Sequence, residues 1–268
     1  MAGFALVANP AFASEISADA LGRLPPADVV ILGEIHDNPE HHRNQARAVA
    51  ALKPPALVFE MLTPQMAAQA PADRSDAAAL ARAFDWQSSG WPDFALYHPI
   101  FAAAPEARIY GGDLPQGDAR RAVSEGAALV FGADAAKYGL VTPLSAEDQS
   151  LREAEQRDAH CDALPEDLLS GMVEAQRLRD AALARAVVQA LDETGGPVAV
   201  ITGSGHARVD RGVPAVLARV APQLRVLSIG QIEAPAAALQ PYDLWVVTQP
   251  APRDDPCAAF AADPPQGG

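Results

Sequence analysis

The chain has 268 residues, a formal net charge of −14 and 49% apolar residues. This length suits one large domain or two small ones, and the apolar content excludes a disordered chain. The acidic balance excludes a nucleic-acid-binding protein, because contacts to phosphate need a basic surface.

The first 13 residues resemble the end of a secretory signal peptide. Gly3 to Ala8 is a short apolar stretch, and Ala11-Phe12-Ala13 matches an A-x-A cleavage site. No basic segment precedes this stretch, so either the start is placed too late or the match is accidental. We expect an exported protein of the periplasm or cell envelope. No cysteine follows the stretch, so a lipid anchor is not expected, and no later run reaches the ~20 apolar residues of a membrane-spanning helix.

Short apolar runs recur along the chain and predict strands. They are nearly continuous in apolar residues, which is typical of strands covered on both faces. Helical segments separate most of them, so we predict an α/β fold with a largely parallel central sheet flanked by helices. The predicted strands are Asp28–Leu32, Ala56–Glu60, Arg108–Gly111, Pro197–Thr202, Leu224–Ile229 and Asp243–Thr248. We expect the first, second and fourth of these to be neighbouring central strands, because each is short, apolar and followed by polar residues.

Helices are predicted between these strands at Pro39–Leu52, Phe94–Ala104 and Pro115–Gly126. Residues 145–192 contain no strand-like run, and we predict that they form a small all-helical subdomain inserted in the α/β core. It begins at Ser145, which starts an [ST]-x-x-[DE] capping pattern, and Pro165 opens its second long helix. The chain therefore divides into a signal remnant (1–13), an α/β domain (14–249) and an irregular Pro-rich tail (250–268).

Cys161 and Cys257 are the two cysteines of the chain. In an exported protein they could form one disulfide that pins the C-terminal tail to a helical segment. They could also be two free thiols, because sequence alone does not place them within bonding distance.

Two Gly-x-x-His tetrapeptides each follow an apolar run, and they end at His36 and His206. Open α/β sheets bind ligands at the carboxyl ends of their strands. We therefore expect the two histidines to face one pocket, together with Glu60 at the tip of a third strand, with the three side chains within about 10 Å of one another. In the alternative interpretation, each histidine only forms hydrogen bonds at the end of its strand.

Two imidazoles with one or two carboxylates suit two kinds of chemistry. Glu34, His36, Glu60 and His206 are a reasonable ligand set for a divalent transition metal. His36, Glu60 and His206 could equally serve as catalytic acid and base groups of a hydrolase. Glu34 could instead act as a base or orient His36.

Other side chains near the motifs are candidates for binding a cofactor. His41 and His42 lie on the first turns of the next helix and point about 100° apart, so both cannot face one point. His42 equally suits the edge of the core. Tyr97 and His98 are further candidates, since both residue types ligate haem iron, although a surface histidine beside aromatic residues explains His98 more simply.

Four arginines flank the two motifs: Arg43, Arg47, Arg208 and Arg211. Cations beside a pocket of an acidic protein favour an anionic ligand, because arginine pairs with carboxylate through two hydrogen bonds. Ordinary surface ion pairs explain them equally well.

Several segments together resemble the ChaN-like family, the haem-binding uptake branch of the Tiki superfamily. They are Ile31-Leu-Gly-Glu-Ile-His-Asp-Asn-Pro-Glu-His-His42, the strand ending at Glu60, the helix around Gln176 to Ala186, and Ile201-Thr-Gly-Ser-Gly-His-Ala-Arg208 with Gly212-Val-Pro214. The resemblance implies an α/β core with a small helical subdomain in a bacterial envelope protein of haem or iron uptake. The cofactor-binding candidates are then His36, His41, His42, Arg43, Tyr97, His98, His206 and Arg208. Family members are often lipoproteins, and this chain has no lipobox cysteine.

Related branches of the superfamily resemble metal-dependent proteases or esterases, whose motif residues would be His36, Glu60 and His206 here. We therefore expect a haem-binding protein, with a metal-dependent hydrolase as the alternative and a structural protein with a degenerate site as a third hypothesis. The chain lacks His-Glu-x-x-His and Gly-x-Ser-x-Gly, which disfavours common zinc proteases and serine hydrolases. Haem is large and flat, so we expect it in an open cleft or between two chains of a homodimer, with an outer-membrane haem receptor system as a further partner.

Overall fold

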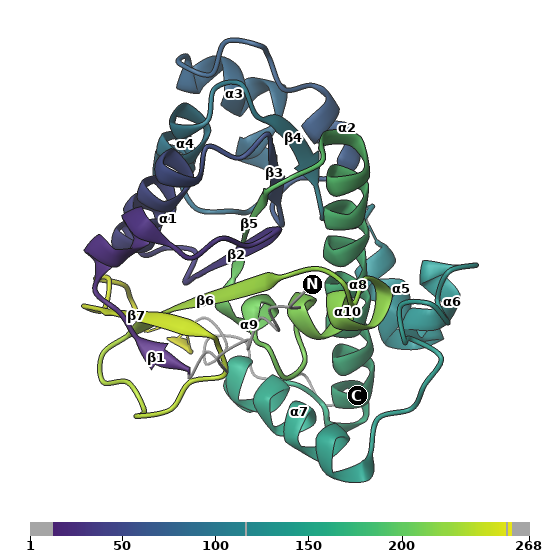
Figure 1. Cartoon of the computed structure of the whole chain (residues 1–268). Helices are drawn as coiled ribbons and strands as arrows, with labels where there is room; N and C mark the ends of the chain where they lie inside the picture. Colours follow the sequence, from purple (N-terminus) through teal and green to yellow (C-terminus); the bar gives the residue numbers. More distant parts are fainter. Residues whose placement is uncertain (1–12, 116, 256, 259–268) are drawn as a thin grey trace, which may run out of the picture.

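In the computed structural model, which describes residues 13–115, 117–255 and 257–258, seven parallel strands form one sheet (Figure 1). Their spatial order is β1-β7-β6-β2-β5-β3-β4, and every pair of neighbours is parallel. The strands are β1 (Ser14–Glu15), β2 (Val29–Glu34), β3 (Ala56–Phe59), β4 (Arg108–Gly111), β5 (Val198–Gly203), β6 (Val226–Glu233) and β7 (Leu244–Thr248).

The three strands expected at the centre are neighbours, as predicted. β5 lies between β2 and β3, with Val198 opposite both Val29 and Ala56. Every residue of these three strands is buried. β2 and β5 run further than predicted and include Glu34 and Gly203, so the polar tips of the strands belong to the sheet itself.

Helices cover both faces of the sheet, which explains why the strands are apolar throughout. On one face, Val30 and Leu32 of β2 pack in a core with α1 (Pro39–Leu52), α3 (Ala77–Ala83) and α4 (Phe94–Ala103). Alternate residues of a strand point to opposite faces, so Val29 and Ile31 join the other core. That core includes α5 (Asp118–Glu125), α6 (Ala127–Phe131), α8 (Glu166–Thr194) and α10 (Val213–Val220).

The helices predicted from sequence are present, with small shifts at their ends. α1 has the predicted bounds because Asn38 caps it, accepting the N–H of Glu40 on its side chain, and Pro39 occupies the first turn. α5 begins three residues later than predicted. Residues 145–192 hold α7 (Ala146–Ala159) and most of α8, and α8 also packs on β3, β4 and β5.

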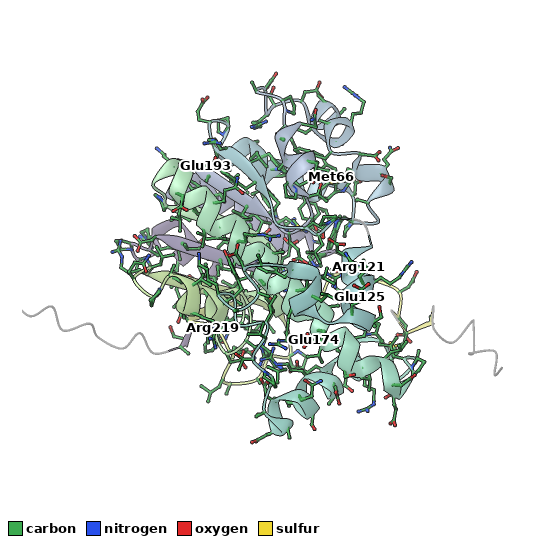
Figure 2. All side chains as sticks on the ribbon, turned by 90° about the vertical axis from the view of Figure 1, so that its right-hand side faces the viewer. Met66, Arg121, Glu125, Glu174, Glu193 and Arg219 are labelled. Atoms are coloured by element: carbon green, nitrogen blue, oxygen red, sulfur yellow. A yellow bond between two sulfur atoms is a disulfide. The ribbon has the colours of Figure 1, made fainter. Side chains whose placement is uncertain are left out.

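Short elements complete the chain. They are the 3-10 helices Ala18–Arg23 and Trp86–Ser88, together with α2 (Pro64–Ala68) and α9 (Ser204–Ala207). Charged side chains pair along the helix surfaces, as Arg121 and Glu125 of α5 do at 2.8 Å (Figure 2). Such pairs leave the acidic surface solvated and contribute little to stability.

The two cysteines form a disulfide between Cys161, which follows α7, and Cys257 in the C-terminal tail. This decides between the two alternatives left open by the sequence. The predicted cleavage site lies almost wholly outside the described residues, of which Ala13 is the first. Within the described residues, no helix is long and apolar enough to cross a membrane.

Candidate functional site

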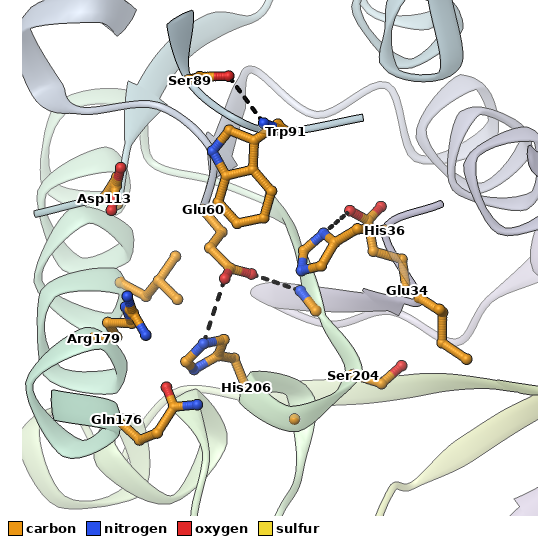
Figure 3. A pocket seen from close by; sticks show the side chains of 15 residues that line it. Glu34, His36, Glu60, Ser89, Trp91, Asp113, Gln176, Arg179, Ser204 and His206 are labelled. Carbon is orange, nitrogen blue, oxygen red and sulfur yellow. Dashed lines mark hydrogen bonds and ion pairs between the residues drawn. The ribbon is translucent and has the colours of Figure 1, made fainter. Parts of the chain in front are cut away.

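A cleft of about 630 Å³ lies at the carboxyl ends of β2, β3 and β5. His36, Glu60 and His206 all line it, so the sequence-distant groups expected to share one pocket do so (Figure 3). The parallel sheet explains this result, because neighbouring parallel strands deliver their carboxyl ends to the same edge.

His36 presents one free ring nitrogen at this cleft. Its Nδ1 donates to Oε1 of Glu34 at 2.8 Å, and its ring packs against Trp91 with centroids 4.7 Å apart. Nε2 makes no hydrogen bond to any described residue, and 30% of the side chain is exposed. Burial alone would lower the pKa of His36, but the hydrogen bond to Glu34 and the charge of Glu60 outweigh it, so the pKa is raised.

The space in front of that nitrogen depends on the glycine at position 203. A Cβ atom there would lie 2.9 Å from Nε2 of His36 and 3.5 Å from Oε2 of Glu60. The φ angle of Gly203 is −58°, so the glycine is required by close approach and not by a left-handed turn. Gly33 is a second such case, with a Cβ only 2.9 Å from Oγ of Ser204. At Gly205, by contrast, a Cβ would meet nothing within 4 Å.

Glu34 is fully buried and holds His36 in place. Its Oε1 accepts hydrogen bonds from His36 and from the Tyr97 hydroxyl, the latter at 3.1 Å. Its Oε2 lies 3.2 Å from Nδ1 of His42. Both carboxylate oxygens therefore contact neighbouring side chains, so Glu34 orients these neighbours, which was one of its predicted roles.

Glu60 is anchored by the end of β5. Its Oε2 accepts the Thr202 hydroxyl at 2.7 Å and the backbone N–H of Gly203 at 2.6 Å. Its Oε1 lies 3.4 Å from Nε2 of His206. Although burial raises the pKa of Glu60, His206 and His36 outweigh burial and leave the pKa far below its usual range. Glu60 is therefore a permanent anion at the floor of the cleft.

His206 lies between two carboxylates. Its Nδ1 contacts Oδ1 of Asp180 at 2.7 Å, while Nε2 faces Glu60. Burial would lower the pKa of His206, but Glu60 and Asp180 raise it to about 10. The two carboxylates therefore favour the charged form of the ring, with a proton on each nitrogen.

Asp180 was not predicted from the sequence. It lies on α8 in line with the buried residues Val173 and Ala184, which are seven residues before it and four after it. A carboxylate on the buried stripe of a helix needs a partner. That pattern is the signal that would have identified Asp180.

Three further residues at the cleft were also missed: Trp91, Asp113 and Arg179. Of the described residues that line the cleft, Arg179 is the one arginine or lysine. It makes no hydrogen bond or ion pair with another described residue. Burial raises the pKa of Asp113, and the charge of Arg179 partly opposes this shift. Figure 3 shows both side chains on the wall formed by α8 and the end of β4.

His41 and His42 are buried behind the cleft and do not line it. His41 accepts the N–H of Ile35 on Nδ1 and donates from Nε2 to the Thr248 hydroxyl, both at 2.8 Å. Burial lowers the pKa of His41 to about 4, so it is neutral. His42 donates from Nε2 to the carbonyl oxygen of His36 at 2.8 Å. Both histidines therefore use their ring nitrogens to fix the loop that carries His36.

Tyr97 and His98 also lie outside the cleft. Tyr97 is fully buried and donates its hydroxyl to Glu34, and burial first and the Glu34 charge second raise its pKa far above the usual range. Nε2 of His98 lies 3.0 Å from the carbonyl oxygen of Arg74. Neither residue therefore presents a free oxygen or nitrogen atom to the cleft for ligating iron.

The four flanking arginines do not line this cleft. Arg43 is exposed and makes no ion pair with a described residue. The others pair with acidic residues: Arg47 with Asp19 at 2.8 Å, Arg208 with Asp210 at 2.6 Å and Arg211 with Glu155 at 2.6 Å. Arg208 and Arg211 instead line an adjoining cavity.

The proposed metal set of Glu34, His36, Glu60 and His206 is not assembled as a metal centre. Among the described residues, no group of three or more histidine, cysteine, aspartate or glutamate side chains has the arrangement to hold an ion. The carboxylates of Glu34 and Glu60 face the histidines, as described above.

Comparisons with known proteins agree with this architecture. The family model for haem-binding uptake proteins of the Tiki superfamily, ChaN, matches residues 20–217. Among solved structures, ChaN of Campylobacter jejuni, described with cofacial haem binding, has a TM-score of 0.64 at 19% identity and covers 84% of this chain and 89% of its own.

More distant structural matches include the type III effector HopBA1 and the erythromycin esterase EreC. HopBA1 has a TM-score of 0.46 at 12% identity over 87% of this chain and 91% of its own. EreC has a TM-score of 0.45 at 12% identity over 77% and 70%. No curated protein matches the sequence.

Proposed function

Because the chain belongs to the haem-binding uptake family of the Tiki superfamily that includes ChaN, we propose that it binds haem in the cleft between His36 and α8. Bound haem would supply an iron atom for a protein side chain to ligate. We propose His36 as the protein ligand of that iron.

The observation that carries this proposal is the arrangement of His36. A histidine that ligates a metal commonly donates its other ring nitrogen to a carboxylate, which fixes the ring and raises the basicity of the ligating nitrogen. His36 has this arrangement, with Nδ1 on Glu34 and Nε2 without a described partner. The missing side chain at Gly203 keeps the space beside Nε2 open.

The rest of the cleft fits a flat, anionic cofactor. Its volume of about 630 Å³ falls in the range of ligand pockets. Trp91 and Leu183 supply apolar surface, and Arg179 supplies a cation for a propionate. All four tyrosines of the chain are buried, which favours a histidine ligand over a tyrosine.

The disulfide supports a location outside the cytoplasm. Structural disulfides persist in oxidising compartments such as the bacterial periplasm and are rare in the cytosol. Together with the signal-like N-terminus, the Cys161–Cys257 bond favours an exported protein of the cell envelope. A role in haem or iron uptake, a homodimer and contact with an outer-membrane haem receptor system are further parts of this proposal.

The metal-dependent hydrolase is the less favoured function. It requires His206 to ligate a metal or act as a base, whereas both ring nitrogens of His206 already face carboxylates, Nδ1 at 2.7 Å from Asp180 and Nε2 at 3.4 Å from Glu60. The geometry instead gives His206 an electrostatic role at the floor of the cleft.

The experiment is a titration of the purified protein with haem, followed by visible absorption, with metal analysis of the protein before haem is added. We expect a shifted and intensified Soret band in the wild type and in His98→Ala, which removes an imidazole outside the cleft. His36→Ala should change the band and weaken binding. Identical spectra for the wild type and His36→Ala would exclude His36 as the ligand. A protein that does not bind haem but carries a stoichiometric metal lost in His36→Ala would favour the hydrolase alternative.

A further inference from the structure

A second cavity of about 190 Å³ adjoins the main cleft behind His206. The two cavities share His206, Gln176 and Gly205 as wall residues. The second cavity is also lined by α7 through Arg152, Glu155 and Gln156, and by Arg208 and Arg211 after α9.

Arg211 is the most informative residue of this cavity. Its side chain is only 9% exposed. One nitrogen, Nη2, donates to Oε1 of Glu155 at 2.6 Å. Nε and Nη1 are buried without a hydrogen-bond partner among the described residues, and Nε lies 3.7 Å from the nearest oxygen of Asp210. A buried guanidinium with two unused donors requires an acceptor that the described protein does not supply.

Two glutamines in the same cavity are also incompletely paired. The Oε1 atoms of Gln156 and Gln176 are buried and have no hydrogen-bond partner among the described residues. A terminal amide that turns by 180° offers its NH₂ group in place of its oxygen. The cavity can therefore surround a small acceptor with donors from Arg211 and from both amides.

Net charge alone does not explain the cavity. Arg152 pairs with Asp148, Arg208 with Asp210 and Arg211 with Glu155, so the charges of all three arginines are largely neutralised. Asp180 faces His206. The unsatisfied hydrogen-bonding capacity is concentrated on Arg211 and the glutamines, and an oxygen-rich anion matches it best.

We propose that this cavity, between Arg211, Gln156 and Gln176, is a binding site for a small oxyanion of carboxylate or phosphate type. The anion has two sources that share this chemistry. It is either free in solution or a carboxylate on the molecule held in the main cleft, which reaches past His206. The second source rests on the proposed haem function, and the first does not.

The test uses two probes on the full-length protein. Inorganic phosphate is titrated by calorimetry at constant ionic strength without haem. Haem and its dimethyl ester, which lacks free carboxylates, are then titrated by absorption. The variants are Arg211→Gln and Gln156→Glu, the latter placing a negative charge in the cavity. Arg47→Gln is the control, because it removes an arginine from an exposed ion pair on α1.

The site binds a free anion if phosphate binds to the wild type and to Arg47→Gln, and if both cavity variants lower the affinity for phosphate about tenfold or more. The site binds a carboxylate of the cleft ligand if phosphate does not bind, but both variants lower the affinity for haem about tenfold and leave the affinity for its dimethyl ester unchanged. The inference is overturned if phosphate does not bind and haem affinity is the same in all variants, since the cavity then holds water only. In that outcome the protein still binds haem, so the proposed function stands. Conversely, a protein that does not bind haem can still bind phosphate, so the two proposals can fail independently.

Discussion

Nδ1 of His206 lies 2.7 Å from Oδ1 of Asp180, and this contact joins α9, directly after β5, to the middle of α8. On its other side, the same ring faces Glu60 at the end of β3. One charged imidazole therefore connects two strands of the sheet with the helix that forms the opposite wall of the cleft.

This ion pair predicts a specific dependence of stability on pH. The folded-state pKa of His206 is about 10, above its ordinary value of 6.5. Its stabilising contribution is therefore complete below pH 6.5 and is lost as the pH rises through about 10. We expect the free energy of unfolding, measured by urea denaturation, to fall with pH across this window by at most about 1.4 kcal/mol per unit. In His206→Gln this slope should disappear, and an unchanged slope would show that the ring is not charged in the folded protein.

A second prediction concerns the carboxylate that orients His36. Glu34→Gln keeps the shape of the side chain but removes the charge that favours a proton on Nδ1 of His36. Replacing such an orienting group typically weakens metal ligation by about 10- to 100-fold. We expect this loss in haem titrations, with the pKa of His36 lowered in an NMR titration of the haem-free protein. Glu40→Gln, an acidic residue on the first turn of α1 outside the cleft, is the control and should bind haem as the wild type does.

The sequence was sufficient to predict the sheet and its functional edge. The apolar runs of β2, β3 and β5 are continuous, which placed these strands at the centre. Because neighbouring parallel strands end at one edge, the convergence of His36, Glu60 and His206 followed from their positions after those strands.

The side of the cleft formed by α8 could not be predicted in the same way. Asp180 and Arg179 are adjacent on that helix, yet Asp180 is buried and Arg179 is only partly buried at the cleft. Which of them faces the sheet depends on the rotation of α8 about its own axis, which tertiary packing determines. His41 was a candidate ligand for a similar reason, since the local pattern does not show that β7 places Thr248 against it.

The disulfide should contribute substantially to stability. Cys161 and Cys257 are 96 residues apart, so their bond removes a large amount of entropy from the unfolded chain. For the double variant Cys161→Ser/Cys257→Ser, we expect a loss of about 2–5 kcal/mol in the free energy of unfolding. The reduced wild type should match the double variant in a urea titration. If reduction leaves the urea midpoint unchanged, the disulfide contributes nothing to global stability.

The glycine at position 203 gives the sharpest test of the geometry around His36. A Cβ at this position would lie 2.9 Å from Nε2, closer than carbon and nitrogen normally approach, so Gly203→Ala should push the imidazole out of place. Its φ of −58° is accessible to alanine, and the effect should therefore come from crowding at Nε2 and not from backbone strain. Gly205→Ala is the matched control, because a Cβ there meets nothing within 4 Å. We expect Gly203→Ala to weaken haem binding by about tenfold or more and to alter the Soret band, since a 1 Å misplacement of a binding group has large effects. Gly205→Ala should bind haem like the wild type, and equal losses in both variants would mean that the space beside Nε2 is not where the iron is held.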